Sequence, residues 1–178
     1  KIMQNSIYIN FLELQDEISI LIIGIKSHDK NKIGENVKDI IRELNKPILL
    51  VNSEFITPKK ILIAYNGSEE SKKILTTAVR NPIFKDVTRD IVNINDDKLF
   101  SEKILDEAKK IYAKSEIDIK TSVLSGDAKT EILTYMYEND CDILAMGAFG
   151  HSRIKEFIFG SFTSEIIAQS KKPILFYR

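Results

Sequence analysis

The chain has 178 residues, 43% of them hydrophobic, with seven glycines and four prolines, a composition typical of one globular domain or slightly more and not of a disordered chain. Lysine plus arginine equals aspartate plus glutamate at 26 each, and this balance argues against a non-specific nucleic-acid-binding protein, which needs a basic surface. Uninterrupted apolar runs are only a handful of residues long, so neither a transmembrane helix nor a signal peptide is expected.

The single cysteine limits the redox and metal chemistry that the chain can support. Cys141 cannot form a disulfide within the chain, and it cannot make a zinc site by itself. It stands just before an apolar run, where a small thiol that faces the core is expected rather than a reactive one. A reduced, cytoplasmic setting is the simplest interpretation.

The first quarter of the chain predicts two buried strands, each next to a helix. Residues 11–17 favour a helix, and the apolar run at 18–23 ends at Gly24. After a polar loop, residues 37–44 show an amphipathic pattern and lead into a second apolar run at 48–51. Short apolar runs bounded by glycine or proline are typical of buried strands.

After a linker at 52–58, predicted strands and helices alternate to the end of the chain. Strands are expected at 61–65, 87–94, 117–124, 143–146 and 173–177. Helices are expected from a cap at Ser68 to a point before Pro82, and over 100–114, 130–138 and 162–168. Arg89 and Asp90 weaken the second strand, and the alternating pattern of 117–124 places that strand nearer the sheet edge. The alternation predicts a doubly wound α/β fold, with a parallel five-stranded sheet and helices on both faces.

The glycines that follow the run at 143–146 have the spacing of a phosphate site. The run stops at Gly147, Gly150 comes next, and Gly160-Ser161 opens a helix. Glycine lets the backbone approach a ligand closely, and the first amides of a helix attract an anion. The pattern G-x2-G-x9-G-S is neither the G-x-G-x-x-G of dinucleotide folds nor the G-x-x-x-x-G-K-[ST] of P-loops.

At these residues the chain resembles the universal stress protein family, whose ATP-binding members carry G-x2-G-x9-G-[ST]. The resemblance extends to residues 59–69 and 173–177, in the order of the family's first and last strands, and covers about 120 residues, one domain's worth. It implies a Rossmann-like fold of the adenine nucleotide alpha hydrolase type and an ATP-binding regulatory module.

The resemblance also assigns roles to individual residues. Backbone amides near Gly150 and Ser161 are expected to hold phosphates, while the ends of the first two strands are expected to contact adenine. The expected ATP-binding residues are Ala64, Tyr65, Asn66, Ile94, Gly126, Met146, Gly147, Gly150, His151, Gly160, Ser161, Phe162 and Thr163. No catalytic residue or metal ligand is predicted, and Mg²⁺ is expected only through the phosphates.

Three of these residues have simpler interpretations that stay open. Asn66 stands where family members usually carry an aspartate, and it either contacts the nucleotide without a charge or only forms a turn with Gly67. Ile94 fits a plain core position equally well. His151 has no serine–acid constellation or metal cluster to serve, so it is a polar contact beside the phosphates or a loop residue.

An internal repeat divides the chain. Pro47 and Pro173 are 126 positions apart (173 − 47), and Gly24 and Gly147 are 123 apart (147 − 24). We therefore expect residues 1–53 to be the C-terminal part of a degenerate universal stress protein domain and residues 58–178 to be a complete one. In the first copy Glu35 stands where Ser161 stands in the second, and its carboxylate would repel a phosphate.

The leading hypothesis is an ATP-binding universal stress protein with at most slow hydrolysis, because no general base, P-loop lysine or paired carboxylates are evident. One alternative is an interaction protein that binds no nucleotide. A second is an adenylating enzyme on a related scaffold, although its S-G-G-x-D-[ST] and H-x-G-H motifs are absent.

The expected partners follow from the same reasoning. The resemblance implies an adenine nucleotide as ligand. It also implies, because domains of the family pair through their last strands, that the segments 48–51 and 174–177 pair within one chain as a pseudo-dimer that can further homodimerise. No specific nucleic acid and no membrane partner is expected.

Overall fold

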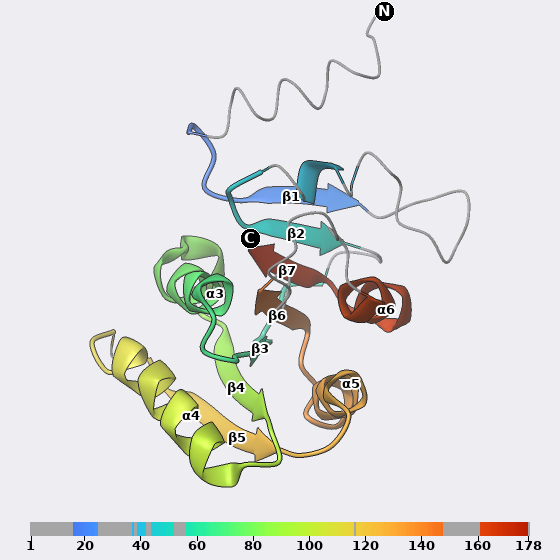
Figure 1. The fold of residues 1–178 in the computed structure, drawn as a ribbon. Coiled ribbons are helices and arrows are strands. Elements are labelled where there is room, and N and C mark those ends of the chain that lie inside the picture. Colours follow the sequence, from blue (N-terminus) through green and yellow to red (C-terminus); the bar gives the residue numbers. More distant parts are fainter. Residues whose placement is uncertain are drawn as a thin grey trace, which may run out of the picture.

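The computed structural model describes residues 16–24, 37, 39–41, 44–51, 56–115, 117–147 and 161–177. These residues form one sheet with the strand order β1-β2-β7-β6-β3-β4-β5 (Figure 1). The strands are β1 (Leu21–Gly24), β2 (Ile48–Val51), β3 (Lys60–Ala64), β4 (Thr88–Ile94), β5 (Ile119–Leu124), β6 (Ile143–Gly147) and β7 (Ile174–Tyr177). The main helices are α3 (Glu69–Arg80), α4 (Lys98–Tyr112), α5 (Ala128–Glu138) and α6 (Ser161–Gln169), and a short 3₁₀ turn, η1, spans Pro82–Phe84.

The predicted strands and helices from residue 61 onward are all present, each with bounds within about two residues of those predicted. In the first quarter, both predicted strands are present, and residues 37 and 39–41 are helical within the expected stretch 37–44. Of the helix expected at 11–17, only Asp16 and Glu17 lie within the described residues, and they form a turn.

The sheet is parallel throughout except at one junction. Strands β7, β6, β3, β4 and β5 form the parallel five-stranded sheet that the sequence predicted, with β5 at its edge. Strand β1 pairs in parallel with β2, whereas β2 pairs antiparallel with β7 through Leu49 opposite Leu175. The prediction that the segments 48–51 and 174–177 pair within one chain is therefore confirmed.

Helices cover both faces of the sheet. Figure 1 shows α3 and α4 on one side and α5 and α6 on the other. Successive strand side chains point to opposite faces, so Leu62 and Ala64 pack under α5 and α6 while Ile61 and Ile63 pack under α3 and α4. Among the described residues, no helix combines the length and apolar character needed to cross a bilayer.

The two charged residues predicted to weaken β4 are instead buried in it. Arg89 is 3% exposed, and its guanidinium donates to the carbonyl oxygens of Ala78, Phe84 and Val87. The Asp90 carboxylate accepts a hydrogen bond from the Tyr135 hydroxyl at 3.1 Å. Hydrogen bonds of this kind allow a charged side chain to be buried inside a sheet.

Cys141 is fully buried beside the amino end of β6, so its thiol should be unreactive in the folded chain. Burial, with a smaller contribution from the nearby Asp90, raises the pKa of this thiol to about 11 from an ordinary 9.0. At pH 8 the thiolate fraction then falls about a hundredfold, in addition to the loss of access. We expect a thiol-specific chromogenic reagent to label the native protein over hours and the urea-unfolded protein within minutes. Equal labelling rates in the two states would contradict this expectation.

Candidate functional site

The carboxyl ends of four parallel strands, β3 to β6, meet at one edge of the sheet. From β3 the chain moves outward through β4 and β5, then returns to place β6 on the other side of β3. The strand order therefore reverses between β3 and β6. In open α/β sheets ligands bind beyond the strand ends at such a point.

At the end of β3, Asn66 makes a local turn. Its side-chain oxygen accepts a hydrogen bond from the backbone amide of Ser68 at 3.0 Å, and Gly67 adopts a positive φ of +80°. Ser68 then caps α3, its hydroxyl accepting from the Ser71 amide at 3.2 Å, as the sequence predicted. The oxygen of Asn66 is thus used in turn chemistry, as the simpler of its two interpretations proposed.

The Tyr65 side chain lies on the opposite face of the sheet from Ala64. Its ring packs under α3 and α4, and its hydroxyl donates to the Glu107 carboxylate at 2.8 Å. Burial and the acceptor Glu107 together raise the pKa of Tyr65 well above its usual range. If a ligand binds beyond the carboxyl end of β6, Tyr65 can contact it only through its backbone.

A buried asparagine that the sequence analysis did not single out fixes the ends of β3 and β4. The side-chain amide of Asn93 donates to the carbonyl oxygen of Tyr65 at 2.7 Å, and its side-chain oxygen accepts from the Ser101 hydroxyl at 2.7 Å. Asn93 is 3% exposed. A polar residue inside the apolar run 91–94 was the signal for this role, because buried amides are normally paired.

Four apolar side chains gather at the carboxyl edge on the face covered by α5 and α6. Ala64 pairs in register with Met146, and Ile94 pairs with Leu124. Met146 is buried, while Ala64, Ile94 and Leu124 are half-buried and pack against the same core cluster. The structure thus brings to one face two of the residues expected to contact adenine, Ala64 and Ile94, and a third expected ATP-binding residue, Met146.

Gly126, two residues after the end of β5, has a conformation that favours glycine, with φ at +113°. Its amide donates to the Asp96 carboxylate at 3.3 Å, which ties the loops that follow β4 and β5 together. Asp96 was not among the predicted site residues. Asp127 then caps α5, accepting from the Thr130 amide at 3.0 Å.

Gly147 has a packing reason to lack a side chain. A Cβ built there would lie 2.8 Å from the Cβ of Glu70 and 3.0 Å from the backbone nitrogen of Ser71. The first turn of α3 therefore presses against the end of β6. This contact alone would require a glycine, whether or not a ligand also approaches.

The rest of the predicted phosphate site lies mostly beyond what the structure describes. Gly150, His151 and Gly160 are outside the described residues, and α6 begins at Ser161, the side chain of which is also outside them. In the next two positions Phe162 is 36% exposed, and Thr163 is buried. Glu165 of the same helix forms an ion pair with Lys129 of α5.

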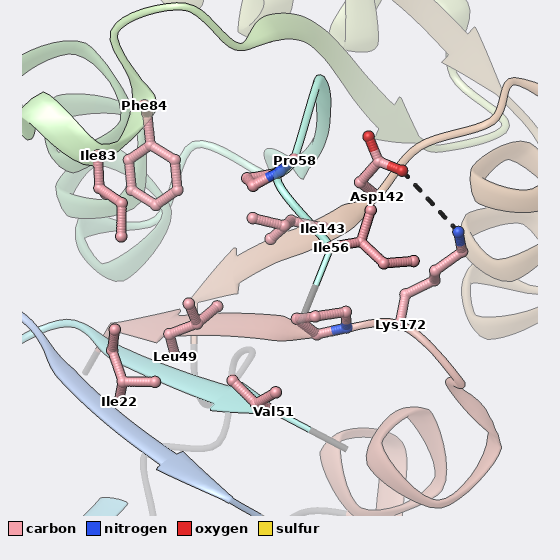
Figure 2. A pocket seen from close by; sticks show the side chains of 11 residues that line it. Ile22, Leu49, Val51, Ile56, Pro58, Ile83, Phe84, Asp142, Ile143 and Lys172 are labelled. Carbon is pink, nitrogen blue, oxygen red and sulfur yellow. Dashed lines mark ion pairs between the residues drawn. The ribbon is translucent and has the colours of Figure 1, made fainter. Parts of the chain in front are cut away.

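Among the residues that the structure describes, metal-binding side chains do not gather at this edge. Within the described ranges, no group of three or more histidine, cysteine, aspartate or glutamate side chains is placed to hold a metal ion. A pocket of about 110 Å³ lies at the opposite end of β6 and β7, near Asp142 and Pro173 (Figure 2). Its lining is almost entirely apolar, so it is separate from the glycine-rich edge in both place and chemistry.

The model of the universal stress protein family matches residues 57–178. The chain belongs to the universal stress protein family. The resemblance drawn from the glycine pattern is therefore confirmed at the level of the family.

Two relatives of this universal stress protein are longer than the matched part. The universal stress protein Slr1230 of Synechocystis is 30% identical over 172 residues, which cover 93% of this chain and 60% of the relative. The stress response protein NhaX of Bacillus subtilis is 28% identical over 99 residues, which cover 56% of this chain and 58% of the relative. The chain thus covers about 60% of the length of these relatives.

Solved structures share the fold. A universal stress protein from Archaeoglobus fulgidus superimposes with a TM-score of 0.77 at 18% identity, covering 96% of this chain and 64% of that one. A universal stress protein solved in complex with cAMP gives a TM-score of 0.57 at 19% identity, covering 68% of this chain and 97% of that one. The α/β fold expected for a universal stress protein is confirmed.

Proposed function

We propose that this universal stress protein binds an adenine nucleotide, ATP in the first place, at the carboxyl edge of the sheet and acts as a nucleotide-responsive regulatory module in the cytoplasm. The observation that carries the proposal is the meeting of Ala64, Ile94 and Met146 on one face at the point where the strand order reverses. An apolar face at such a point suits a planar base. A relative solved in complex with cAMP supports the same ligand class.

The phosphates would lie against the start of α6. The first amides of a helix have no partner within the helix, and together with the helix dipole they favour an anion. The Ser161 amide opens α6, and Thr163 follows in its first turn. Together with the glycine pattern up to Gly160, this arrangement provides groups that can bind phosphates.

Slow hydrolysis is part of the proposal. The oxygen of Asn66 is engaged by the Ser68 amide, and asparagine carries no charge that could hold a divalent ion. Mg²⁺ would then be held by the phosphates alone. The Asp96 carboxylate, which lies at this edge, already accepts the Gly126 amide, and binding rather than turnover is the expected output.

The proposal includes two unequal halves, residues 1–53 and 58–178. The pairing of β1 with β2, Leu21 opposite Ile48, reproduces the pairing of β6 with β7, Leu144 opposite Ile174. The two registers are related by the same offsets of 123 and 126 positions that the sequence repeat gives. This agreement supports a degenerate, partial first domain that is paired with a complete second one.

Titration of ATP into the full chain by calorimetry tests the proposed site. Ser161→Glu places a carboxylate where the phosphates would lie, so we expect the affinity for ATP to fall by about tenfold or more. Gly160→Val should weaken binding similarly. Ala113→Glu is the matched control, because Ala113 is exposed at the end of α4, on the far side of the sheet. Unchanged affinity in both site variants would reject the site.

A protein that acts through interactions without nucleotide is the second candidate. It is favoured by two observations, the engagement of Asn66 in a turn and the packing requirement at Gly147, because both explain a motif residue without a ligand. Absence of co-purified nucleotide, together with no shift of the unfolding temperature in ATP, would favour this candidate over the first.

A further inference from the structure

Strand β1 is the last strand of the sheet, and within the described ranges no strand pairs with its outer edge. Among the described residues it pairs only with β2. Leu21 and Ile23 point into the core, so Ile22 points to the other face, where it is 53% exposed. An unpaired strand edge next to an exposed apolar residue favours pairing with another strand.

The internal repeat shows what covers the equivalent surface in the second half. Strand β6 corresponds to β1, and its free edge is occupied by β3, which pairs from Ile61 opposite Ile143 to Ala64 opposite Met146. Helix α3, which follows β3, packs across β6 and β7 on the face of Ala145. Subtracting 123 transfers these contacts to residues 20–23 of the first half, with Ile22 in the place of Ala145.

The two equivalent glycines differ in what lies against them. At Gly147 an added Cβ would meet the first turn of α3 at 2.8 Å. At Gly24 the nearest atom among the described residues is the carbonyl oxygen of Val51, at 4.0 Å. Neither glycine has a positive φ, so backbone conformation does not require either of them. Gly24 therefore leaves space for the first turn of a helix. Among the described residues, no helix occupies that space.

The apolar pocket extends the same surface. Ile22, Leu49 and Val51 line it from β1 and β2, and Figure 2 shows Ile56 and Pro58 facing them from the connection to β3. The pocket lies at the carboxyl ends of β1 and β2, which is the end where Gly24 stands. By the repeat, this is where a helix that follows an added strand would begin.

We infer that the β1 edge, together with Ile22, Gly24 and Val51, is a docking surface for a strand–turn–helix polypeptide of the kind that β3 and α3 form. The partner adds a parallel apolar strand along residues 20–23 and lays the first turn of an amphipathic helix against Gly24. The strand supplies backbone hydrogen bonds, as in other cases of strand addition to a sheet edge. This inference does not depend on nucleotide binding.

The probe is a synthetic peptide with the sequence of residues 59–81, the strand–turn–helix of the second half, added to the full chain. Hydrogen–deuterium exchange of the amides of residues 20–24 is the readout, because strand addition protects them. We expect saturable protection in the wild-type chain. Gly24→Val fills the clearance for the helix turn and should weaken binding at least about tenfold, and Ile22→Lys should act in the same direction.

Leu99→Lys is the matched control, since Leu99 is 71% exposed at the start of α4 and lies far from β1. It should bind the peptide as the wild type does. Three results would overturn the inference: no saturable protection at millimolar peptide, protection that Gly24→Val leaves unchanged, or a dimer of the chain that light scattering detects and Ile22→Lys dissociates. The last result would make a second copy the occupant.

Discussion

Arg89→Met should lower the free energy of unfolding by about 3–5 kcal/mol, much of the stability of a domain of this size. The guanidinium donates to the Ala78 carbonyl at 2.8 and 3.2 Å and also to the carbonyls of Phe84 and Val87. Ala78 lies in the last turns of α3, where the helix dipole favours a positive charge. Methionine would remove the guanidinium donors from three buried carbonyls, of which that of Phe84 keeps the backbone amide of Val87 at 3.3 Å. A buried acceptor that loses its donor costs about 1–3 kcal/mol before relaxation.

Urea unfolding followed by circular dichroism measures this loss, because the chain has no tryptophan to report by fluorescence. Arg80→Met removes the same group from an exposed position in the last turn of α3 and is the matched control. It should cost less than about 1 kcal/mol, the usual size of an exposed interaction with the helix dipole. A cost below about 1 kcal/mol for Arg89→Met as well would mean that water satisfies the three carbonyls.

The boundaries of the helices show where the sequence analysis was weakest. Helix α4 begins at Lys98, two residues before the predicted start, because Asp97 caps it through the Phe100 amide at 3.0 Å. Helix α5 begins at Ala128 for the same reason, with Asp127 as its cap. The first turn of α4 is mostly exposed and that of α5 is only partly buried, so the pattern of buried apolar residues begins only after each helix has started.

The candidate site was predictable in its location and less so in its contacts. Apolar runs that end at glycine identify the strand ends, and a doubly wound sheet brings those ends together, so Ala64, Ile94 and Met146 were expected at one edge. The side of the sheet taken by Tyr65 follows from alternation with Ala64 and was open to prediction. Its partner Glu107 lies 42 positions away, and no local pattern connects the two.

The charged residues of β4 also depend on contacts that the sequence pattern does not reveal, in this case in the core. Arg89 and Asp90 reduce the strand signal because propensity treats a charged residue as exposed. Their burial depends on acceptors at the end of α3 and a donor on α5, which only the folded chain brings near. Buried charges are thus an expected point of failure for pattern-based prediction, and they mark contacts that hold elements together.

Gly147→Val should destabilise the protein and Gly24→Val should not, although the offset of 123 positions in the proposed repeat aligns the two glycines. At Gly147 the added side chain would collide with Glu70 and Ser71, so α3 must shift or β6 must bend. Overpacking of this kind costs about 1–3 kcal/mol, and a helix N-terminus cannot move as easily as a flexible side chain. The unfolding midpoint in urea should fall accordingly.

At Gly24 the same substitution meets open space in the described chain and restricts the unfolded state, so stability should change by less than about 0.5 kcal/mol or rise slightly. Both glycines end a strand, and neither has a positive φ, so the difference between the variants isolates the contact with α3. Equal losses would show that something already lies against Gly24, and the β1 edge would then not be free to accept a strand and helix. A small loss of stability in Gly147→Val would instead show that α3 can shift to make room for the side chain. The glycine would then need another explanation, and close approach of a ligand to the backbone is the first to test.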